Sequence, residues 1–387
     1  MKKPEKSSVL STGLAMFAMF FGAGNVVFPL ALGQYAQDQN LYAVLGLLLS
    51  AICVPFAGLI AMILFNGKYQ EFFGRLGRIP GFVVALVIMG LIGPFGAMPR
   101  CIALSYSTLS MFTPSISLPL FSAIACLILF AFTVRPSSII DVLGKYLTPF
   151  LLGSLLLIII KGIATAPGAP VSGHDPVATF MMGLKEGYQT MDLLGAFFFS
   201  TVVTTSLHQH LHPKDKSDYK KIVALALKAS AIGAFLLAGI YIGFSYVAAM
   251  TSASLTHVPK DQILGSIALE VMGPYAGIVT SIAVALACLT TAIALANVFA
   301  EFIHADISKG KIKYPYALIG TIVATYFVST LNFTGIVAAL APILSVGYPA
   351  LIVLSLLNIM YKLYKFEPVK IPVLFVFMFS LGETFLG

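Results

Sequence analysis

The chain has 387 residues, of which 59% are hydrophobic and 10% are charged, and its formal net charge is +8. A soluble domain usually has about 45–50% apolar and about 25% charged residues. A chain of this size with so few charges cannot cover its surface with polar side chains, which argues against a soluble enzyme, a nucleic-acid-binding protein and a disordered scaffold. Apolar stretches of about 20 residues recur from end to end, and each can cross a hydrocarbon layer about 30 Å thick. The composition therefore predicts an all-α polytopic membrane protein.

Eleven membrane-spanning helices are predicted, with no soluble domain between them. In chain order they cover residues 10–33, 41–65, 80–112, 116–134, 140–163, 183–206, 222–250, 272–304, 314–331, 335–361 and 371–387. The longest polar connections are 164–182, 207–221 and 251–271. The first span follows a lysine-rich start but has no small-x-small cleavage site, so we expect a retained helix rather than a signal peptide.

The distribution of lysine and arginine predicts a cytoplasmic N-terminus. In that orientation nearly all basic residues fall in cytoplasmic segments, while the outside loops hold only Lys260, with Lys161 and Lys185 near outer helix ends. Such a bias is the rule for multi-pass membrane proteins. It explains the positive charge without nucleic acid, and it supports the span count because one missed helix would invert every later loop. The four cysteines show no metal-ligand spacing, so no metal centre or disulfide is expected.

The first predicted span is interrupted near its middle. It contains Gly22, Ala23, Gly24 and Asn25, followed by Pro29. Glycine and proline are poor choices for a continuous lipid-facing helix. Backbone groups freed by an unwound stretch must face protein or a water-filled cavity. A close helix crossing through small residues is the alternative interpretation.

The sixth predicted span carries the sequence Glu186 to Asp192 (EGYQTMD), and Gly195 follows. An acidic residue inside a membrane span is costly and commonly marks a substrate or ion path. For Glu186, solvation at the outer interface is an equal alternative. The first and sixth spans are five helices apart, so the second set of five enters the membrane with the opposite orientation. Interrupted helices at corresponding positions of inverted halves predict a transporter site near the bilayer midplane.

The eighth predicted span has adjacent threonines, Thr290 and Thr291. A threonine in a helix often only donates to its own i−4 carbonyl. Two neighbouring hydroxyls that face the interrupted first span would instead suit an alkali cation.

Five stretches resemble the branched-chain amino acid:cation symporter family of bacteria. They are 20–29 (FFGAGNVVFP), 93–100 (GPFGAMPR), 144–149 (GKYLTP), 186–192 (EGYQTMD) and 287–293 (ACLTTAI). The family belongs to the amino acid–polyamine–cation superfamily, so the resemblance implies a five-plus-five inverted-repeat fold. The repeats would be residues 1–163 and 164–365, with an additional C-terminal span at 366–387. Members of the family usually have one span more than the eleven predicted here.

A more distant resemblance, to sodium symporters of the neurotransmitter type, implies roles for individual residues. Ala23 and Gly24 would give backbone amides to a substrate carboxylate, and Val27 stands where that group has a gating arginine. Together with the two interrupted spans, this predicts a set of substrate-binding residues: Gly22, Ala23, Gly24, Asn25, Tyr188, Gln189, Thr190 and Asp192. The implied ligands of one sodium are the Asn25 side-chain oxygen and the Phe20 carbonyl, with the Thr190 hydroxyl aligned to within a residue or two. Those of a second sodium are the carbonyls of Ala18, Phe21 and Ala287 and the hydroxyls of Thr290 and Thr291.

Two further groups of charged residues need an account. Arg100 lies deep in the long third span, and our hypothesis is that it pairs with Glu186 or Asp192 and holds the broken sixth helix. Snorkelling to the outer headgroups is the alternative. His208, His210 and His212 alternate as metal ligands can, but their lysine-rich surroundings favour a solvated loop.

The resemblance implies a secondary transporter in the bacterial cytoplasmic membrane. It would couple uptake of branched-chain amino acids (Leu, Ile and Val) to a cation, expected to be sodium, by alternating access. The alternative is a proton-coupled transporter of another small neutral amino acid, with Asp192 or Glu186 as the proton carrier. An intramembrane enzyme or a channel fits the pattern less well. No cofactor is expected beyond the co-transported ion, and the partners would be the substrate, the ion and the lipid bilayer.

Overall fold

The computed structural model describes residues 5–112, 115–134, 138–210 and 219–386, and these form helices, turns and no strand. The predictions on His212 and on the side chains of His208, His210 and residues 144–148 lie outside the described part of the chain. Five helical stretches are long and apolar enough to cross a membrane by themselves, and shorter apolar helices accompany them. The protein is an integral membrane protein, as the composition predicts.

The predicted spans correspond to the helices in order. They are α1 (Glu5–Phe20) with α2 (Ala23–Ala36), α3 (Asn40–Leu48) with a π-helical turn and α4 (Val54–Ile63), α6 (Arg78–Ile92) with α7 (Ala97–Ser110), α8 (Leu118–Val134), α9 (Ser138–Thr165), α10 (Pro176–Gln189) with α11 (Asp192–His210), α12 (Tyr219–Met250), α14 (Pro274–Glu301), α15 (Tyr314–Ser329), α16 (Asn332–Tyr364) and α17 (Lys370–Leu386). Two short helices, α5 (Tyr69–Gly74) and α13 (Ile263–Met272), lie in the connections.

Two predictions about these elements are wrong. The third span is not one continuous helix, because α6 ends at Ile92 and α7 begins at Ala97. Pro94 has no N–H with which to continue the helical hydrogen bonds, and the chain turns between Gly93 and Gly96. The connection 251–271 is not simply polar loop, because most of its second half is the amphipathic helix α13, which buries Ile263, Leu264 and Ile267.

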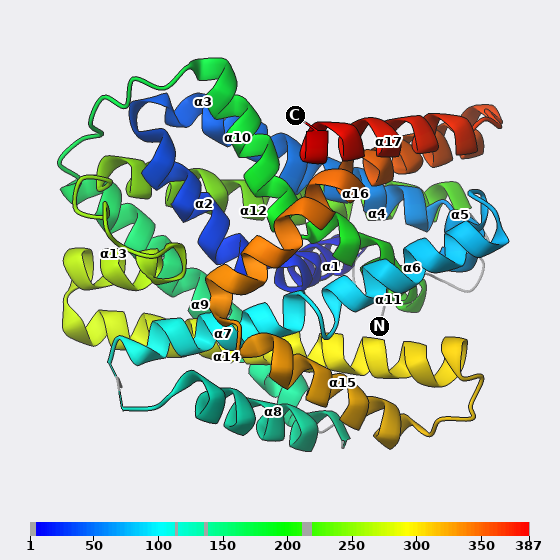
Figure 1. The fold of residues 1–387 in the computed structure, drawn as a ribbon, viewed down its shortest axis with the longest axis horizontal. Helices are drawn as coiled ribbons and strands as arrows, with labels where there is room; N and C mark the ends of the chain where they lie inside the picture. The colour runs from blue at the N-terminus through cyan, green and yellow to red at the C-terminus, as the bar shows by residue number, and fades with distance from the viewer. Residues whose placement is uncertain (1–4, 113–114, 135–137, 211–218, 387) are drawn as a thin grey trace.

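The helices pack as two halves that repeat one pattern. Both pieces of the first broken helix, α1 and α2, pack against α12, and both pieces of the second, α10 and α11, pack against the helix formed by α3 and α4. In the same way α7, in the third span, packs along α14, in the eighth (Figure 1). These equivalent contacts agree with the five-plus-five inverted repeat expected from the sequence. Helix α17 packs beside α16, outside this pattern (Figure 1).

Glycines allow the closest crossings at equivalent places in the two halves. Where α3 crosses α10, a Cβ built on Gly46 would lie 2.2 Å from the Phe180 carbonyl oxygen, and one on Gly183 would lie 2.1 Å from the Ala43 carbonyl oxygen. Where α1 crosses α12, a Cβ on Gly13 would lie 2.7 Å from Ile232 Cβ. Lipid gives helices little hydrophobic drive to associate, so close backbone packing of this kind holds membrane helices together. The glycines thereby fix how each broken helix sits on its neighbour.

A substitution at one crossing tests this packing. Gly183→Ala should lower the free energy of unfolding by about 1–3 kcal/mol, because the new methyl group overlaps a carbonyl of the neighbouring backbone. Gly239→Ala in α12 is the matched control, since nothing lies within 4 Å of its Cβ position. The control should be neutral or slightly stabilising, because alanine favours the helix. Thermal unfolding of the purified protein in detergent measures both, and shifts of equal size and sign would contradict the packing argument.

Candidate functional site

The first helix break exposes backbone groups through one diverted hydrogen bond. Helix α1 ends at Phe20, and Gly22 is extended, with φ −124° and ψ −164°, before α2 begins at Ala23. The Gly22 N–H would close the next helical turn on the Ala18 carbonyl, but it donates to Asn25 Oδ1 instead, over 3.0 Å. Ala23 and Gly24 stand in the first turn of α2, where N–H groups have no partner within the helix. The break therefore presents carbonyl oxygens on one side and amides on the other.

The second break touches the first. Helix α10 ends at Gln189 and α11 begins at Asp192, with Met191 between them at φ +64°, a left-handed conformation that is uncommon for such a side chain. A Cβ on Gly24 would lie 3.0 Å from Thr190 Cα, so only glycine allows this approach of the two chains. The Thr190 hydroxyl donates to the Gly187 carbonyl over 2.8 Å and so satisfies part of the end of α10.

A buried polar network joins the two breaks. The Asn25 side-chain amide donates to Asp192 Oδ2 over 2.7 Å and also to the Tyr241 hydroxyl. The Tyr241 hydroxyl in turn donates to the same Asp192 oxygen over 3.1 Å. Asn25 is 1% exposed, Asp192 5% and Tyr241 0%. The buried carboxylate thus holds the first span, the sixth span and α12 together.

Sequence reasoning missed two tyrosines of this site. Tyr241 in α12 completes the network above, and Tyr348 in α16 accepts a hydrogen bond of 3.2 Å from the Leu193 N–H in the first turn of α11. Tyr348 also stacks on Tyr188, with ring centroids 4.8 Å apart. Both stand in apolar spans, where a buried tyrosine hydroxyl usually has a partner. That rule was the available signal, but it could not have named the partners.

A small cavity of about 50 Å³ lies between the breaks. Room of this size admits a few water molecules or an ion. Of the predicted residues, Phe20, Gly22, Ala23, Gly24, Asn25, Arg100, Thr190, Asp192 and Thr291 line it. Ile92, Met191, Phe199 and Leu295 contribute apolar walls. Tyr188, Gln189, Ala18, Phe21, Ala287 and Thr290 are not among the residues that line it. The structure thus brings the first, third, sixth and eighth spans to one place.

The two threonines of α14 make the local bonds expected of membrane threonines. The hydroxyls of Thr290 and Thr291 donate to the Ala287 carbonyl over 2.9 and 3.0 Å. A hydroxyl that donates in this way keeps its oxygen lone pairs for another partner. Thr291 also faces the first break, since a Cβ on Gly22 would lie 3.7 Å from its methyl group.

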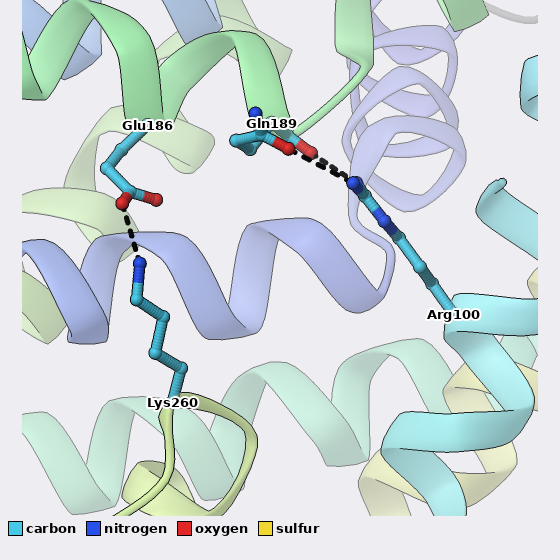
Figure 2. A network of polar contacts seen from close by, with 4 residues as sticks. All are labelled: Arg100, Glu186, Gln189 and Lys260. Atoms are coloured by element: carbon cyan, nitrogen blue, oxygen red, sulfur yellow. Dashed lines mark hydrogen bonds and ion pairs between the residues drawn. The ribbon is translucent and has the colours of Figure 1, made fainter. Parts of the chain in front are cut away.

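The predicted pairing of Arg100 with a carboxylate is wrong. Arg100 Nη1 donates to the Gln189 carbonyl over 2.7 Å, and Nη2 donates to Gln189 Oε1 over 3.1 Å (Figure 2). Glu186 instead forms an ion pair of 2.7 Å with Lys260 (Figure 2). Snorkelling is also wrong for Arg100, which is 2% exposed. Arg100 does bind the end of α10, but through an uncharged residue.

Lys260 belongs to a segment that covers the other end of the broken helices. A second cavity, of about 390 Å³, lies there between α2, α10 and residues 252–260. The neighbouring Asp261 accepts a hydrogen bond from Ser107 in α7, and Gln34 in α2 donates to the Leu255 carbonyl. Adjacent residues of one turn, Lys260 and Asp261, therefore connect the sixth span to the third.

Removing one hydroxyl tests the network around Asp192. Tyr241→Phe should lower the free energy of unfolding by about 1–2 kcal/mol, because it takes one donor from the buried carboxylate and one acceptor from Asn25. Tyr246→Phe, on the same helix but 38% exposed, is the matched control and should change little. Thermal unfolding in detergent compares them, and an unchanged midpoint for Tyr241→Phe would show that the network adds no stability.

The fold has a clear counterpart among solved structures. The chain aligns with the inward-facing conformation of Mhp1 at a TM-score of 0.65, with 15% sequence identity, covering 92% of this chain and 77% of that one. At this identity the likeness concerns the fold alone.

Relatives are much closer in sequence. The chain is 32% identical to the branched-chain amino acid permease BrnQ of Bacillus subtilis (strain 168), over 99% of this chain and 88% of that protein. It is 30% identical to BrnQ of Corynebacterium glutamicum, over 97% and 85% of the respective chains. Residues 5–386 match the family described as branched-chain amino acid transport protein. The protein is thus a transporter rather than an enzyme, and it belongs to the branched-chain amino acid transport protein family.

Proposed function

We propose that the protein imports branched-chain amino acids together with sodium by alternating access. The observation that carries this proposal is the cavity at which the amides of the α2 N-terminus, the Asp192 carboxylate and an apolar wall meet. The names of its relatives, branched-chain amino acid permeases, support the choice of substrate. The site would open to each side of the membrane in turn.

The residues that line the cavity carry the groups that a zwitterionic amino acid requires, and the cavity would widen beyond its present volume of about 50 Å³ to admit one. Ala23 and Gly24 offer N–H groups at the positive end of a helix dipole to the substrate carboxylate. Asp192 offers a buried negative charge to the ammonium group. Phe199 and Leu295 belong to the apolar wall that suits an aliphatic side chain. One methylene is worth about 1–3 kcal/mol in such a pocket, so Leu, Ile and Val should compete for it.

The sodium ion is proposed at the oxygen-rich side of the same breaks. The Ala18 carbonyl, freed by the diverted Gly22 bond, and the Thr291 hydroxyl are hard ligands of the kind that alkali cations favour. Further ligands would come from the carbonyls of Phe20, Phe21 and Ala287 and from the hydroxyls of Thr190 and Thr290. An ion bound here lies close to the substrate carboxylate, so each reduces the electrostatic cost of binding the other, and the coupling is reciprocal.

Alternating access would follow from the way the halves pack. Spans one, two, six and seven are held together by the glycine crossings and by the Asn25–Asp192–Tyr241 network. This bundle would rock against spans three, four, eight and nine around the fixed cavity. We propose the repeat boundaries at residues 163 and 365, and a cytoplasmic N-terminus in the bacterial inner membrane on the charge asymmetry of the loops.

Proton coupling through Asp192 is the alternative for the driving ion. One observation favours it: within the described residues, Asp192 is buried with neutral hydrogen-bond donors and has no cationic side chain within ion-pair distance. A carboxylate in that setting is easily protonated.

Uptake into proteoliposomes distinguishes the two ions. Radiolabelled leucine should accumulate with an imposed sodium gradient and not with a proton gradient alone. Thr291→Ala should reduce sodium-driven uptake by about 10-fold or more through loss of one cation ligand, and Thr291→Ser should restore most of it. Thr321→Ala is the matched control, because Thr321 makes the same i−4 bond in α15 away from the cavity. Leucine uptake driven by a proton gradient alone would contradict sodium coupling and support proton coupling.

Asp192→Asn separates an ammonium partner from a proton carrier. If Asp192 binds the substrate, the variant should lose both net accumulation and leucine–leucine exchange, by about 10-fold or more, because an amide carries no charge to pair with the ammonium. Asp175→Asn, at the exposed N-cap of α10, should behave as the unchanged protein because asparagine also caps helices. Loss of accumulation with intact exchange would instead assign the proton to Asp192.

A further inference from the structure

The guanidinium of Arg100 is buried beside the cavity with only part of its donors engaged. It extends from α7 toward the end of α10 (Figure 2), and both end-on nitrogens, Nη1 and Nη2, donate to the single residue Gln189. Its central carbon lies 5.5 Å from the centroid of the Phe28 ring, on the α2 side. Nε is buried and has no hydrogen-bond partner. The side of the guanidinium formed by Nε and Nη2 therefore has a free N–H, and Nη2 has a second one.

The positive charge of Arg100 is balanced only from a distance, through the electrostatic effect of the Glu186 carboxylate. Among the described residues no acidic side chain lies within ion-pair distance of it: Glu186 is taken by Lys260, and Asp192 is bonded by Asn25 and Tyr241. Burying a charge without a counter-charge costs several kcal/mol, and the Gln189 dipoles and the Phe28 ring offset only part of that. A site arranged in this way favours the arrival of an anion.

The same cavity supplies a second group that favours an anion. Arg100 lines it together with Ala23 and Gly24, whose N–H groups open the 14-residue helix α2. The side-on edge of an arginine binds a carboxylate through two parallel N–H···O bonds, which are among the stronger hydrogen bonds in proteins. Asp192, the negative group of the cavity, lines it as well. A guanidinium and a carboxylate in one cavity complement the two charges of an amino acid.

We propose that Arg100 binds the carboxylate of the transported amino acid through its Nε and Nη2 edge, beside the first-turn amides of α2. This assignment rests on the proposed function and adds a substrate-binding residue from the third span to the two broken helices. Arg100 then links the substrate to Gln189, because the same guanidinium holds the end of α10. The substrate class is α-amino acids with a free carboxylate.

The test compares leucine with leucinamide, which keeps the side chain and the ammonium group but lacks the carboxylate charge. Binding of both to the purified protein in detergent is measured by competition against radiolabelled leucine, for wild type and for Arg100→Gln. In wild type, leucine should bind about 10–100-fold more tightly than leucinamide. In Arg100→Gln that preference should fall to within about 3-fold, mostly through weaker leucine binding.

Two controls keep the result specific. Arg75→Gln removes another arginine that connects distant parts of the chain. Arg75 donates to Asn358 over 2.8 Å and to the Glu367 carbonyl over 2.7 Å, and none of these three residues lines the cavity. Arg75→Gln should lower the unfolding temperature without changing the preference for leucine over leucinamide. Arg100→Lys keeps the charge but not the side-on pair of donors, so its preference should be intermediate, and it serves if Arg100→Gln does not fold.

The outcomes separate the two claims. An equal loss of both ligands in Arg100→Gln, with the preference retained, would overturn the assignment and leave Arg100 as a positioning residue for Gln189. Failure of wild type to bind leucine at all would overturn the proposed function, and the assignment with it.

Discussion

Asn25 in the first broken helix and Asp192 in the second are joined by a hydrogen bond of 2.7 Å, and much of the site depends on it. In a membrane, backbone groups that leave a helix need partners within the protein. Asn25 meets that need in two directions, since its oxygen takes the Gly22 N–H and its amide reaches Asp192 and Tyr241. One side chain thus stabilises the unwound segment and fixes it against the opposite half of the molecule.

The close approach of the halves depends on residues without side chains. Gly24 allows the backbone of the first break to contact Thr190. Gly46 and Gly183 allow equally close backbone packing between α3 and α10. Because these crossings recur in both halves, the two broken helices are held by the same means. Small residues thus set the distance between neighbouring helices, and a few polar residues fix how the helices are aligned along one another.

The charges of the site are arranged so that each has a different function. Lys260 and Glu186 form an ion pair at the second cavity and connect a loop to α10. Asp192 is held by neutral donors, and Arg100 is held by Gln189. Within the part of the chain that the structure describes, neither Asp192 nor Arg100 forms an ion pair, although both line one cavity. Under the proposed function, this separation leaves both charges free for a zwitterionic substrate, whereas a direct Arg100–Asp192 pair would occupy both.

The sequence alone determined the membrane class, the eleven spans and the interruption at Gly22–Asn25, because hydrophobicity and the backbone effects of glycine and proline are local properties. For the second interruption it indicated only the stretch from Glu186 to Gly195, and the structure placed the break at Thr190 and Met191. The sequence did not show the break at Gly93–Gly96 or the helix α13, although the glycines and the apolar residues were visible. The partner of Arg100 and the roles of Tyr241 and Tyr348 were decided only by the tertiary structure. Those contacts join residues 49 to 216 positions apart, and sequence spacing carries no information on which of several buried polar groups will meet across packed helices.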